Sequence, residues 1–509
     1  MSTSPELRRG SREKEFTPPP PPPIMRIDSR YLLAVLVGIT TILAFPKPQF
    51  HADHSELPAT PMASSSDKRD SSSAKALYVI TTKDGTTRDQ FNSEVKGFDN
   101  GVGLESVHDA VDYQVYTTHL TESQAAEMEK IDCVRYVWKE MDEDDDNDDS
   151  DEDRATPLYE QTEHKLERRA RIVRRNSPTQ LTLLSWNKPG VPESDDYIAD
   201  STLGKGTTIY IIDTGFNLNV PDLANTADRQ VHYYVVDNEK TLPLGRSLSN
   251  PAWRKPQDMT DWSDHGTGVA CVAGGLVYGV ASKANLFLVK AKNAWQKPGE
   301  PLEISKYRLA ALSEATMVVL GHIRTYTRGK AVVNLSLGKP ASRKATQLFD
   351  DFIARLEQLD TGTVTSAGNT GTTPGSGLEQ RTPTNLGTDS DSLVTVGGVK
   401  DNGNLWRLTV PERPNQAGSM SVYAQAEDVE TINAYGAEAD VSGTSYAAAT
   451  ISGLMAYFLG HKDSPRYLRP GFVAIDLKGL VTRLSTAISS GRGIQSGQRA
   501  VSRMQRLST

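Results

Sequence analysis

Ser445 is the first of several polar side chains in this 509-residue chain that could take part in nucleophilic catalysis. It stands in the stretch DVSGTSYAAATISG, between Gly443-Thr444 and a run of small residues. A serine in this setting is either a nucleophile or a hydroxyl that satisfies an unpaired backbone N–H near the start of a helix. The two interpretations can be distinguished by whether the rest of the chain contains residues that could activate Ser445.

An acid and a base that could activate a serine lie upstream. Asp213 ends the apolar run TTIYIID, where it could cap a turn or hold an imidazole through its Nδ1–H. His265 precedes GTGVACVAGG, and this histidine could also be structural. The small residues after it favour a catalytic interpretation, because they let a helix approach a sheet closely and leave room for a substrate. With an ordinary pKa near ~6.5, an imidazole suits a general base at neutral pH.

Asn369 ends the stretch GTVTSAGN and is a candidate for binding a negatively charged oxygen. An asparagine beside glycines is ordinarily turn chemistry. Its NH2 group could instead stabilise a developing oxyanion, and loss of one such donor lowers kcat by about 10²–10³-fold. The backbone N–H of Ser445 would be the second donor, assisted by the dipole of the helix that begins there.

These residues belong to a region in which apolar strands alternate with helical patterns. That alternation predicts an α/β fold, a parallel sheet with helices on both faces, whose reactive groups gather at the carboxyl ends of the strands. We find no internal repeat. The expected strands are 207–213, 285–291, 331–338, 362–369 and 392–398, and the expected helices begin at 265 or cover 305–326, 342–359 and 445–459.

Taken together, Asp-Thr-Gly, His-Gly-Thr-Gly, Ser-Ala-Gly-Asn and Gly-Thr-Ser-Tyr-Ala-Ala resemble the motifs of the subtilisin-like serine peptidases, the subtilases, over about residues 186–460. The resemblance implies a serine endopeptidase with a subtilisin-like fold that works through an acyl-enzyme. It assigns Asp213 as the orienting acid, His265 as the base, Ser445 as the nucleophile and Asn369 as the oxyanion donor.

The same resemblance implies a substrate-binding region. The stretch VVNLSLGKP looks like the substrate-binding strand of the family, around Ser336, Leu337 and Gly338, and we add the small residues Ser366, Ala367 and Gly368. Protein or peptide substrates are the implied partners, and nucleic acid is not. The chemistry requires no cofactor and no metal; structural calcium is common in the family, but we assign no ligands to it.

Two positions depart from the family pattern. Tyr446 stands where the family commonly has methionine, and Ala449 where it commonly has proline. Neither residue supplies a proton or a charge, so the departures concern the shape of the pocket and the start of the helix. A polar stretch resembling an insertion, from 237 to 264, also separates Asp213 from His265, and the sequence does not reveal its role.

A smaller module precedes the catalytic region. Residues 76–141 predict strands at 76–82, 113–120 and 133–140, with helices from Thr87 and from Thr121, which has Gln124 in capping-box spacing. This order suits a ferredoxin-like α+β module and looks like the inhibitory propeptide of the family. The expected divisions are an extension over 1–74, the propeptide over 75–141, a charged linker over 142–185, the catalytic domain over 186–462, and a C-terminal helix with a basic tail over 463–509.

The N-terminal extension contains an apolar segment, 30–45, that is short for a membrane span, which needs ~20 residues. Counted from Met25, it resembles a signal peptide with cleavage near Ala44, so we expect a secreted protein. The alternative is an uncleaved single-pass anchor with a Pro-rich cytoplasmic tail, favoured by basic residues before the segment. Both alternatives place the catalytic domain outside the cytosol.

The charge and the cysteine content argue against a nucleic-acid-binding protein and against a disulfide-rich protein. The run from Asp142 to Asp153 contains ten carboxylates, without which the net charge of −8 becomes +2, so no basic surface for nucleic acid is indicated. Cys133 and Cys271 are the only cysteines, too few for a disulfide framework, and we interpret Cys271 as a small buried apolar residue.

The linker carries two dibasic pairs, Arg168-Arg169 and Arg174-Arg175, either of which could be a processing site. We therefore predict a secreted serine endopeptidase made as a zymogen. The alternatives are a non-catalytic subtilase fold used for binding, which a missing triad residue would have marked, and an intracellular interaction protein organised by its acidic and Pro-rich tracts.

Overall fold

Nine strands form the central sheet of the computed structural model. The structure describes residues 75–98, 105–110, 113–140, 171–185, 194–236, 259–292, 294–295, 303–304, 306–487 and 499–501. All neighbouring pairs are parallel except the last one. From one edge to the other, the order is β8 (Val231–Val235), β9 (Asn285–Lys290), β7 (Thr208–Asp213), β12 (Ala331–Leu335), β14 (Gly362–Ser366), β16 (Leu393–Val399), β17 (Val422–Gln425), β21 (Arg499–Val501) and the antiparallel β20 (Ser485–Ala487).

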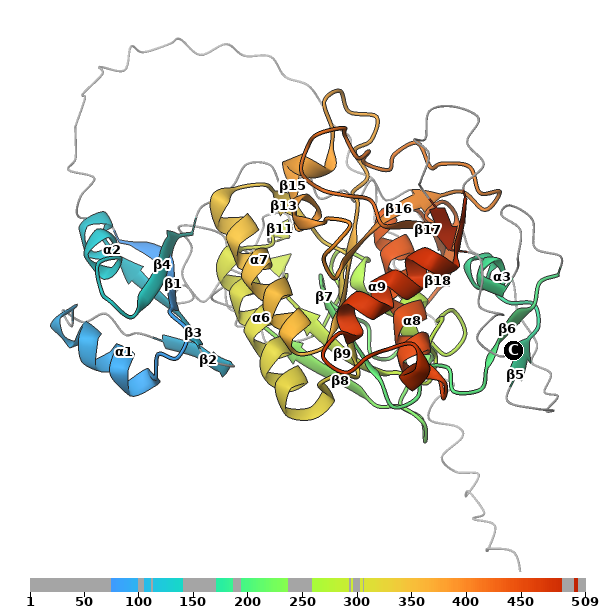
Figure 1. The fold of residues 1–509 in the computed structure, drawn as a ribbon, viewed down its shortest axis with the longest axis horizontal. Helices are drawn as coiled ribbons and strands as arrows, with labels where there is room; N and C mark the ends of the chain where they lie inside the picture. Colours follow the sequence, from blue (N-terminus) through green and yellow to red (C-terminus); the bar gives the residue numbers. More distant parts are fainter. Residues whose placement is uncertain are drawn as a thin grey trace, which may run out of the picture. The chain divides into compact units, whose positions relative to one another are not determined.

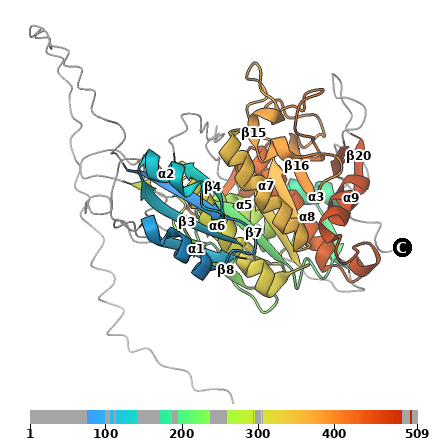
Figure 2. The ribbon, with the colours of Figure 1, turned by 60° about the vertical axis from the view of Figure 1, so that its left-hand side comes forward.

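Helices cover both faces of this sheet, as the sequence predicts (Figures 1 and 2). Alternate residues of β7 enter different cores: Ile209 and Ile211 pack in one, Tyr210 and Ile212 in the other. The first core also contains α5 (Gly266–Gly274), α8 (Thr444–Gly460) and α9 (Val473–Leu484), and the second contains α6 (Leu309–His322) and α7 (Arg343–Gln358). Strands buried on both faces explain the continuous apolar runs in the sequence.

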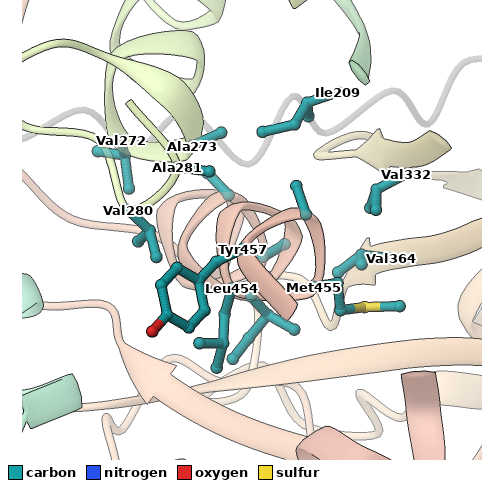
Figure 3. Close-up of a cluster of buried hydrophobic side chains, with 14 of the residues drawn as sticks. Ile209, Val272, Ala273, Val280, Ala281, Val332, Val364, Leu454, Met455 and Tyr457 are labelled. Carbon is teal, nitrogen blue, oxygen red and sulfur yellow. The ribbon is translucent and has the colours of Figure 1, made fainter. Parts of the chain in front are cut away.

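Helix α8 lies at the centre of the first core, and buried side chains surround it (Figure 3). Met455 packs beside Gly362 so closely that a Cβ added to Gly362 would lie 2.6 Å from the methionine Cε. Fully burying one such large apolar side chain stabilises a fold by about 1.5–3 kcal/mol. The core therefore fixes the helix whose first turn carries Ser445.

The predicted helices differ from the observed ones mainly at their ends. Helix α7 has Ser342 as its N-cap, and α8 begins one residue earlier than predicted, at Thr444. Helix α6 begins at Leu309 and passes into the π-helical turn η5 (Ile323–Thr327). Four strands of this sheet were not predicted: β8, β17, β20 and β21.

Residues 171–185, which we assigned to the charged linker, pack with the catalytic domain. Strand β5 (Arg171–Arg174) pairs antiparallel with β6 (Tyr197–Asp200), and α3 (Thr179–Ser185) buries Leu181 and Leu184 in the core that contains α8. The packed domain thus extends to Arg171. The acidic run and Arg168-Arg169 lie outside the described residues.

The N-terminal module, residues 75–140, contains the elements β1 (Ala76–Thr82), α1 (Arg88–Glu94), η2 (Val95–Phe98), β2 (Glu105–Ala110), β3 (Tyr113–Leu120), α2 (Glu122–Met128) and β4 (Val134–Lys139). Its antiparallel sheet has the order β2-β3-β1-β4, with one strand, β2, that the sequence did not predict. This βαββαβ succession is the one expected for a ferredoxin-like module. The capping box of Thr121 and Gln124 is present at α2.

Shorter elements connect these parts. A hairpin of β18 (Val429–Ile432) and β19 (Glu438–Val441) precedes α8. The others are η3 (Pro221–Leu223), β10 (Ala294–Trp295), β11 (Glu303–Ile304), β13 (Lys339–Pro340), η6 (Leu378–Gln380), β15 (Arg381–Thr382), η7 (Thr384–Leu386) and η8 (Ser464–Arg466). In the described part of the chain, no helix is long and apolar enough to cross a membrane. The apolar segment 30–45 lies outside it.

Candidate active site

The four predicted catalytic residues lie at the ends of strands or the starts of helices, at the carboxyl-terminal end of the parallel sheet. Asp213 is the last residue of β7, and His265 is the N-cap of α5. Asn369 follows the end of β14 by three residues, and Ser445 is the second residue of α8. Four segments that are distant in sequence therefore supply the candidate site.

Asp213 and His265 form a close pair. The Nδ1 of His265 lies 2.8 Å from Oδ1 of Asp213, and the backbone N–H of Thr214 donates to the same oxygen at 2.7 Å. The aspartate side chain is fully buried, whereas 15% of the histidine side chain is exposed. The pair thus has a buried carboxylate end and a partly exposed imidazole end.

A second buried carboxylate, Asp261, holds the loops that carry this pair. Its Oδ1 accepts a hydrogen bond from the Thr214 hydroxyl at 2.7 Å, and its Oδ2 accepts from the N–H and the hydroxyl of Thr267, each at 2.8 Å. The Thr214 hydroxyl in turn accepts the N–H of Gly266 at 3.1 Å. Burial raises the pKa of Asp261, while these hydrogen bonds oppose the rise. Sequence reasoning missed this residue.

Close backbone packing also fixes the turn after Asp213. Gly215 has a φ of +150°, and a Cβ there would collide with the carbonyl oxygen of Thr260. Lys290, at the end of β9 and paired in register with Asp213, donates to that same carbonyl at 2.7 Å. The turn requires glycine because another backbone segment occupies the space of a side chain.

Ser445 lies between two residues that contact the other candidates. Before it, Thr444 donates from its N–H and its hydroxyl to Oδ1 of Asn369, both at 2.9 Å. After it, the ring of Tyr446 lies 5.7 Å, between centroids, from the ring of His265. Ser445 itself is 8% exposed. The neighbours of Ser445 therefore contact the amide and the imidazole, and its own hydroxyl donates to the carbonyl of Ser336 at 3.5 Å.

The hydrogen bonds of Asn369 define the direction of its amide. Because Oδ1 accepts both hydrogen bonds from Thr444, the Nδ2 group is the end that can donate to an oxyanion. The backbone is held as well: the N–H of Gly368, a residue with φ of +99°, donates to the Thr444 hydroxyl at 2.9 Å.

The predicted substrate-binding residues are placed around the same helix end. The hydroxyl of Ser336 donates to the carbonyl of Ser445 at 2.8 Å and accepts from Asn334, so this side chain supports the site from inside. Leu337 is buried, and the carbonyl of Gly338 accepts from Arg381 at 3.2 Å. At the end of β14, Ser366 and Ala367 are buried, and the N–H of Ala367 donates to Val396 at 2.9 Å.

Tyr446 occupies space that a glycine on α5 leaves open. A Cβ added to Gly268 would lie 3.1 Å from Cε1 of the tyrosine ring, and the ring is 3% exposed. The glycine therefore allows the first turn of α8 to pack against α5 beside His265. Cys271, on the same helix, is fully buried, and burial together with Asp222 raises its pKa well above the ordinary value.

No group of three or more His, Cys, Asp or Glu side chains in the described ranges could hold a metal ion. Calcium binding therefore stays a prediction without assigned ligands.

Comparisons with known proteins agree with this fold. Subtilisin-like protease 2 of Trichophyton equinum is 30% identical over 272 residues, 53% of this chain and 54% of that protein. Subtilisin-like protease 9 of Arthroderma otae is 27% identical over 323 residues, 63% of this chain and 67% of that protein. The chain thus spans about half the length of the first of these relatives.

Among solved structures, the Epidermin Leader Peptide Processing Serine Protease from Staphylococcus aureus has a similar fold, with a TM-score of 0.53 at 15% identity, over 84% of this chain and 97% of that one. The model of the Subtilase family matches residues 204–482, just over half of the chain and a range that includes all four candidate catalytic residues. The chain belongs to the subtilase family.

Proposed function

We propose that this chain is a serine endopeptidase whose catalytic residues are Asp213, His265, Ser445 and Asn369. The observation that carries the proposal is the 2.8 Å contact between His265 and the buried Asp213, at the carboxyl-terminal end of the strands, with Ser445 in the first turn of α8. A buried carboxylate on Nδ1 orients the imidazole and stabilises its protonated form. The opposite ring nitrogen is then the one that accepts the serine proton.

In the proposed reaction, His265 removes the proton of the Ser445 hydroxyl while Oγ attacks the peptide carbonyl carbon. The oxyanion of the tetrahedral intermediate accepts hydrogen bonds from Nδ2 of Asn369 and from the N–H of Ser445. His265 then donates its proton to the departing amine, leaving the acyl group on Ser445. Water, deprotonated by the same imidazole, hydrolyses this ester and restores the enzyme.

The proposed substrates are proteins or peptides, bound along Ser336–Gly338 and Ser366–Gly368. The side chain of Ser336 is turned inward and Leu337 is buried, so we assign the binding mainly to backbone groups of Ser336–Gly338, which would pair with the substrate as with an added strand.

We further propose that the N-terminal module is an inhibitory propeptide and that the chain is made as a zymogen. The module shares a core with α6 and α7, to which it contributes Val79, Tyr113, Val115 and Trp138. Arg135 pairs with Asp351 of α7 at 2.9 Å. The carboxylate of Glu140, the last described residue of the module, accepts the backbone N–H groups of Leu309 and Ala310 at the start of α6. These contacts attach the end of the module to the catalytic domain and support the proposal.

We also propose secretion directed by the apolar segment 30–45, on the ground of its signal-like sequence. Recovery of the mature protein from the medium, with an N-terminus beyond Ala44, is the expected result. Recovery only from the membrane fraction would favour the anchor alternative.

A fluorophosphonate probe tests the catalytic proposal. We expect covalent labelling of Ser445, identified by peptide mapping, and loss of both labelling and hydrolysis in Ser445→Ala. Asn369→Ala should still be labelled, with kcat lowered by about 10²–10³-fold, because it loses one oxyanion donor and keeps the nucleophile and base. A folded, processed protein that is not labelled would favour the binding function instead.

A further inference from the structure

The tip of the β18–β19 hairpin carries the most exposed large apolar side chain in the described ranges. Tyr435 is 85% exposed, although the hairpin around it is well ordered by hydrogen bonds. An exposed aromatic residue on a fixed backbone is a feature of binding surfaces, since a tyrosine offers a large contact area and loses little side-chain entropy when it binds.

A single side chain, Asn433, organises the turn that holds Tyr435. Its Oδ1 accepts the N–H groups of Tyr435, at 3.0 Å, and of Ala437, at 2.9 Å. Its own backbone N–H donates to Ala437 and its carbonyl accepts from Gly436, which has a φ of +81°. The backbone at Tyr435 is therefore ordered before any partner binds, which reduces the entropic cost of binding.

The same turn is attached to both loops of the Asp213–His265 pair. The N–H of Ala434 donates to Oδ1 of Asp264, the residue before His265, and the carbonyl of Ala434 accepts from Nδ2 of Asn217 at 2.9 Å. Asn217 in turn donates its N–H to Thr267 of α5 at 3.0 Å. These contacts place the hairpin tip on the histidine side of the candidate site.

That side is the one along which the leaving half of a substrate must pass. In the proposed reaction, His265 gives its proton to the departing amine, so the residues after the scissile bond lie beside this histidine. Tyr435 is adjacent in sequence to Ala434, which is bonded to the neighbour of His265. An aromatic side chain at this place can contact residues farther along the leaving half.

We propose that Tyr435 is a specificity-determining residue that contacts the leaving half of a peptide substrate and favours apolar or aromatic side chains there. The inference rests on the proposed endopeptidase function and assigns it a preference on the leaving-group side. The ring supplies an apolar face for such side chains, and the anchored turn holds that face in position.

Two substrates that differ only after the scissile bond test this inference. One ends in an aminocoumarin and has no residues on the leaving side; the other is an internally quenched peptide with several apolar residues there. For Tyr435→Ala, we expect kcat/KM to fall about three- to tenfold on the long peptide and to stay unchanged on the aminocoumarin. Replacing the apolar residues by serine should remove the difference between wild type and variant.

Two matched variants complete the experiment. Tyr435→Phe keeps the ring and should behave as wild type. Tyr326→Ala is the control for the loss of an exposed tyrosine elsewhere: Tyr326 is 74% exposed and follows α6, on the other face of the sheet. An equal effect of Tyr435→Ala on both substrates, or no effect on either, would overturn this inference alone. A wild-type protein that cleaved neither substrate would overturn the proposed function as well.

Discussion

The carboxylate of Glu140 in the N-terminal module caps helix α6, accepting the backbone N–H of Leu309 at 3.0 Å. Its second oxygen accepts the N–H of Ala310 at 2.8 Å, and the helix has no side-chain cap of its own at Arg308. Unpaired N–H groups at a helix start prefer a negative charge. The module thereby supplies a group that α6 lacks.

For this reason Glu140→Ala should weaken inhibition by the separately produced module. Charge-assisted hydrogen bonds contribute about 1.5–3 kcal/mol, so we expect the inhibition constant to rise by about 10–100-fold. Glu140→Gln, which can still accept one of the two bonds, should have an intermediate effect. Titration of the mature enzyme with each module variant measures this, and equal inhibition by Glu140→Ala and wild type would contradict it.

Alkaline conditions should weaken the same inhibition through Tyr113. The Arg355 guanidinium lies over this ring, 3.8 Å from the ring centre, and burial raises the pKa of Tyr113 from the ordinary value of 10.0 to about 12. A group whose pKa is raised in the complex supports binding fully below its free pKa and loses this contribution as the pH rises through the bound value. Binding should thus weaken between about pH 10 and 12.

Inhibition constants measured across this range, for wild type and Tyr113→Phe, check the linkage. The phenylalanine variant cannot ionise, so its affinity should change less with pH. Parallel curves for the two modules would show that another group causes the alkaline loss.

Asp261 should be needed for turnover although it does not touch the substrate. Asp261→Ala leaves buried donors of Thr214 and Thr267 unsatisfied, each at a cost of about 1–3 kcal/mol, and frees the loop before His265. We expect kcat to fall about 10–100-fold with KM nearly unchanged. Asp261→Asn, which keeps the shape and an acceptor for Thr267, should restore most of the activity.

Steady-state constants on the aminocoumarin substrate, together with melting temperatures, separate this positioning role from simple unfolding. A folded Asp261→Ala protein with the kcat of wild type would show that the Asp213–His265 pair is held by other contacts.

Asp213 could be predicted from the sequence, whereas Asp261 could not. Asp213 was predictable because it ends a continuous apolar run, and a parallel sheet places such ends together. Asp261 stands in a polar stretch without periodicity, and its partner Thr214 is 47 positions away. Only the folded backbone brings the two together, so no local pattern could indicate the contact.

Strand β5 was not predicted from the sequence for a related reason. Its basic residues are typical of a solvated linker, yet Arg174 is held by backbone carbonyls about one hundred positions away: it donates to Leu276 at 3.0 Å and to Gly279 at 2.8 Å. Strand β2 was likewise missed, because ESVHDA has too few apolar residues to predict a strand. Tertiary contacts stabilise both segments.

The contacts of Arg174 limit where the proposed zymogen can be processed. Its guanidinium also lies 4.6 Å from the centre of the Tyr197 ring, and β5 is paired with β6. A protease needs an extended, accessible backbone, so we expect the pair Arg174-Arg175 to stay uncut and the mature N-terminus to lie between residues 142 and 170. N-terminal sequencing checks this, and a mature enzyme beginning at Asn176 would refute it.

Tyr446 should make the enzyme insensitive to mild peroxide. A methionine beside the nucleophile can be oxidised to a bulkier polar sulfoxide, whereas a phenol ring is not oxidised in this way. Met455, on the same helix, is fully buried, and the fully buried Cys271 has a thiol whose pKa is raised well above the ordinary value, so neither should react quickly.

The matched variant is Tyr446→Met, which replaces a ring packed beside Gly268 and His265. Because the ring fills the space that Gly268 leaves open, the shorter methionine should lower the melting temperature slightly and place a thioether near the acyl group. Under one dose of peroxide, we expect wild type to retain its activity and Tyr446→Met to lose most of it as the sulfoxide forms, which mass spectrometry can follow. Rapid, equal inactivation of both proteins would show that position 446 does not control oxidation at this site.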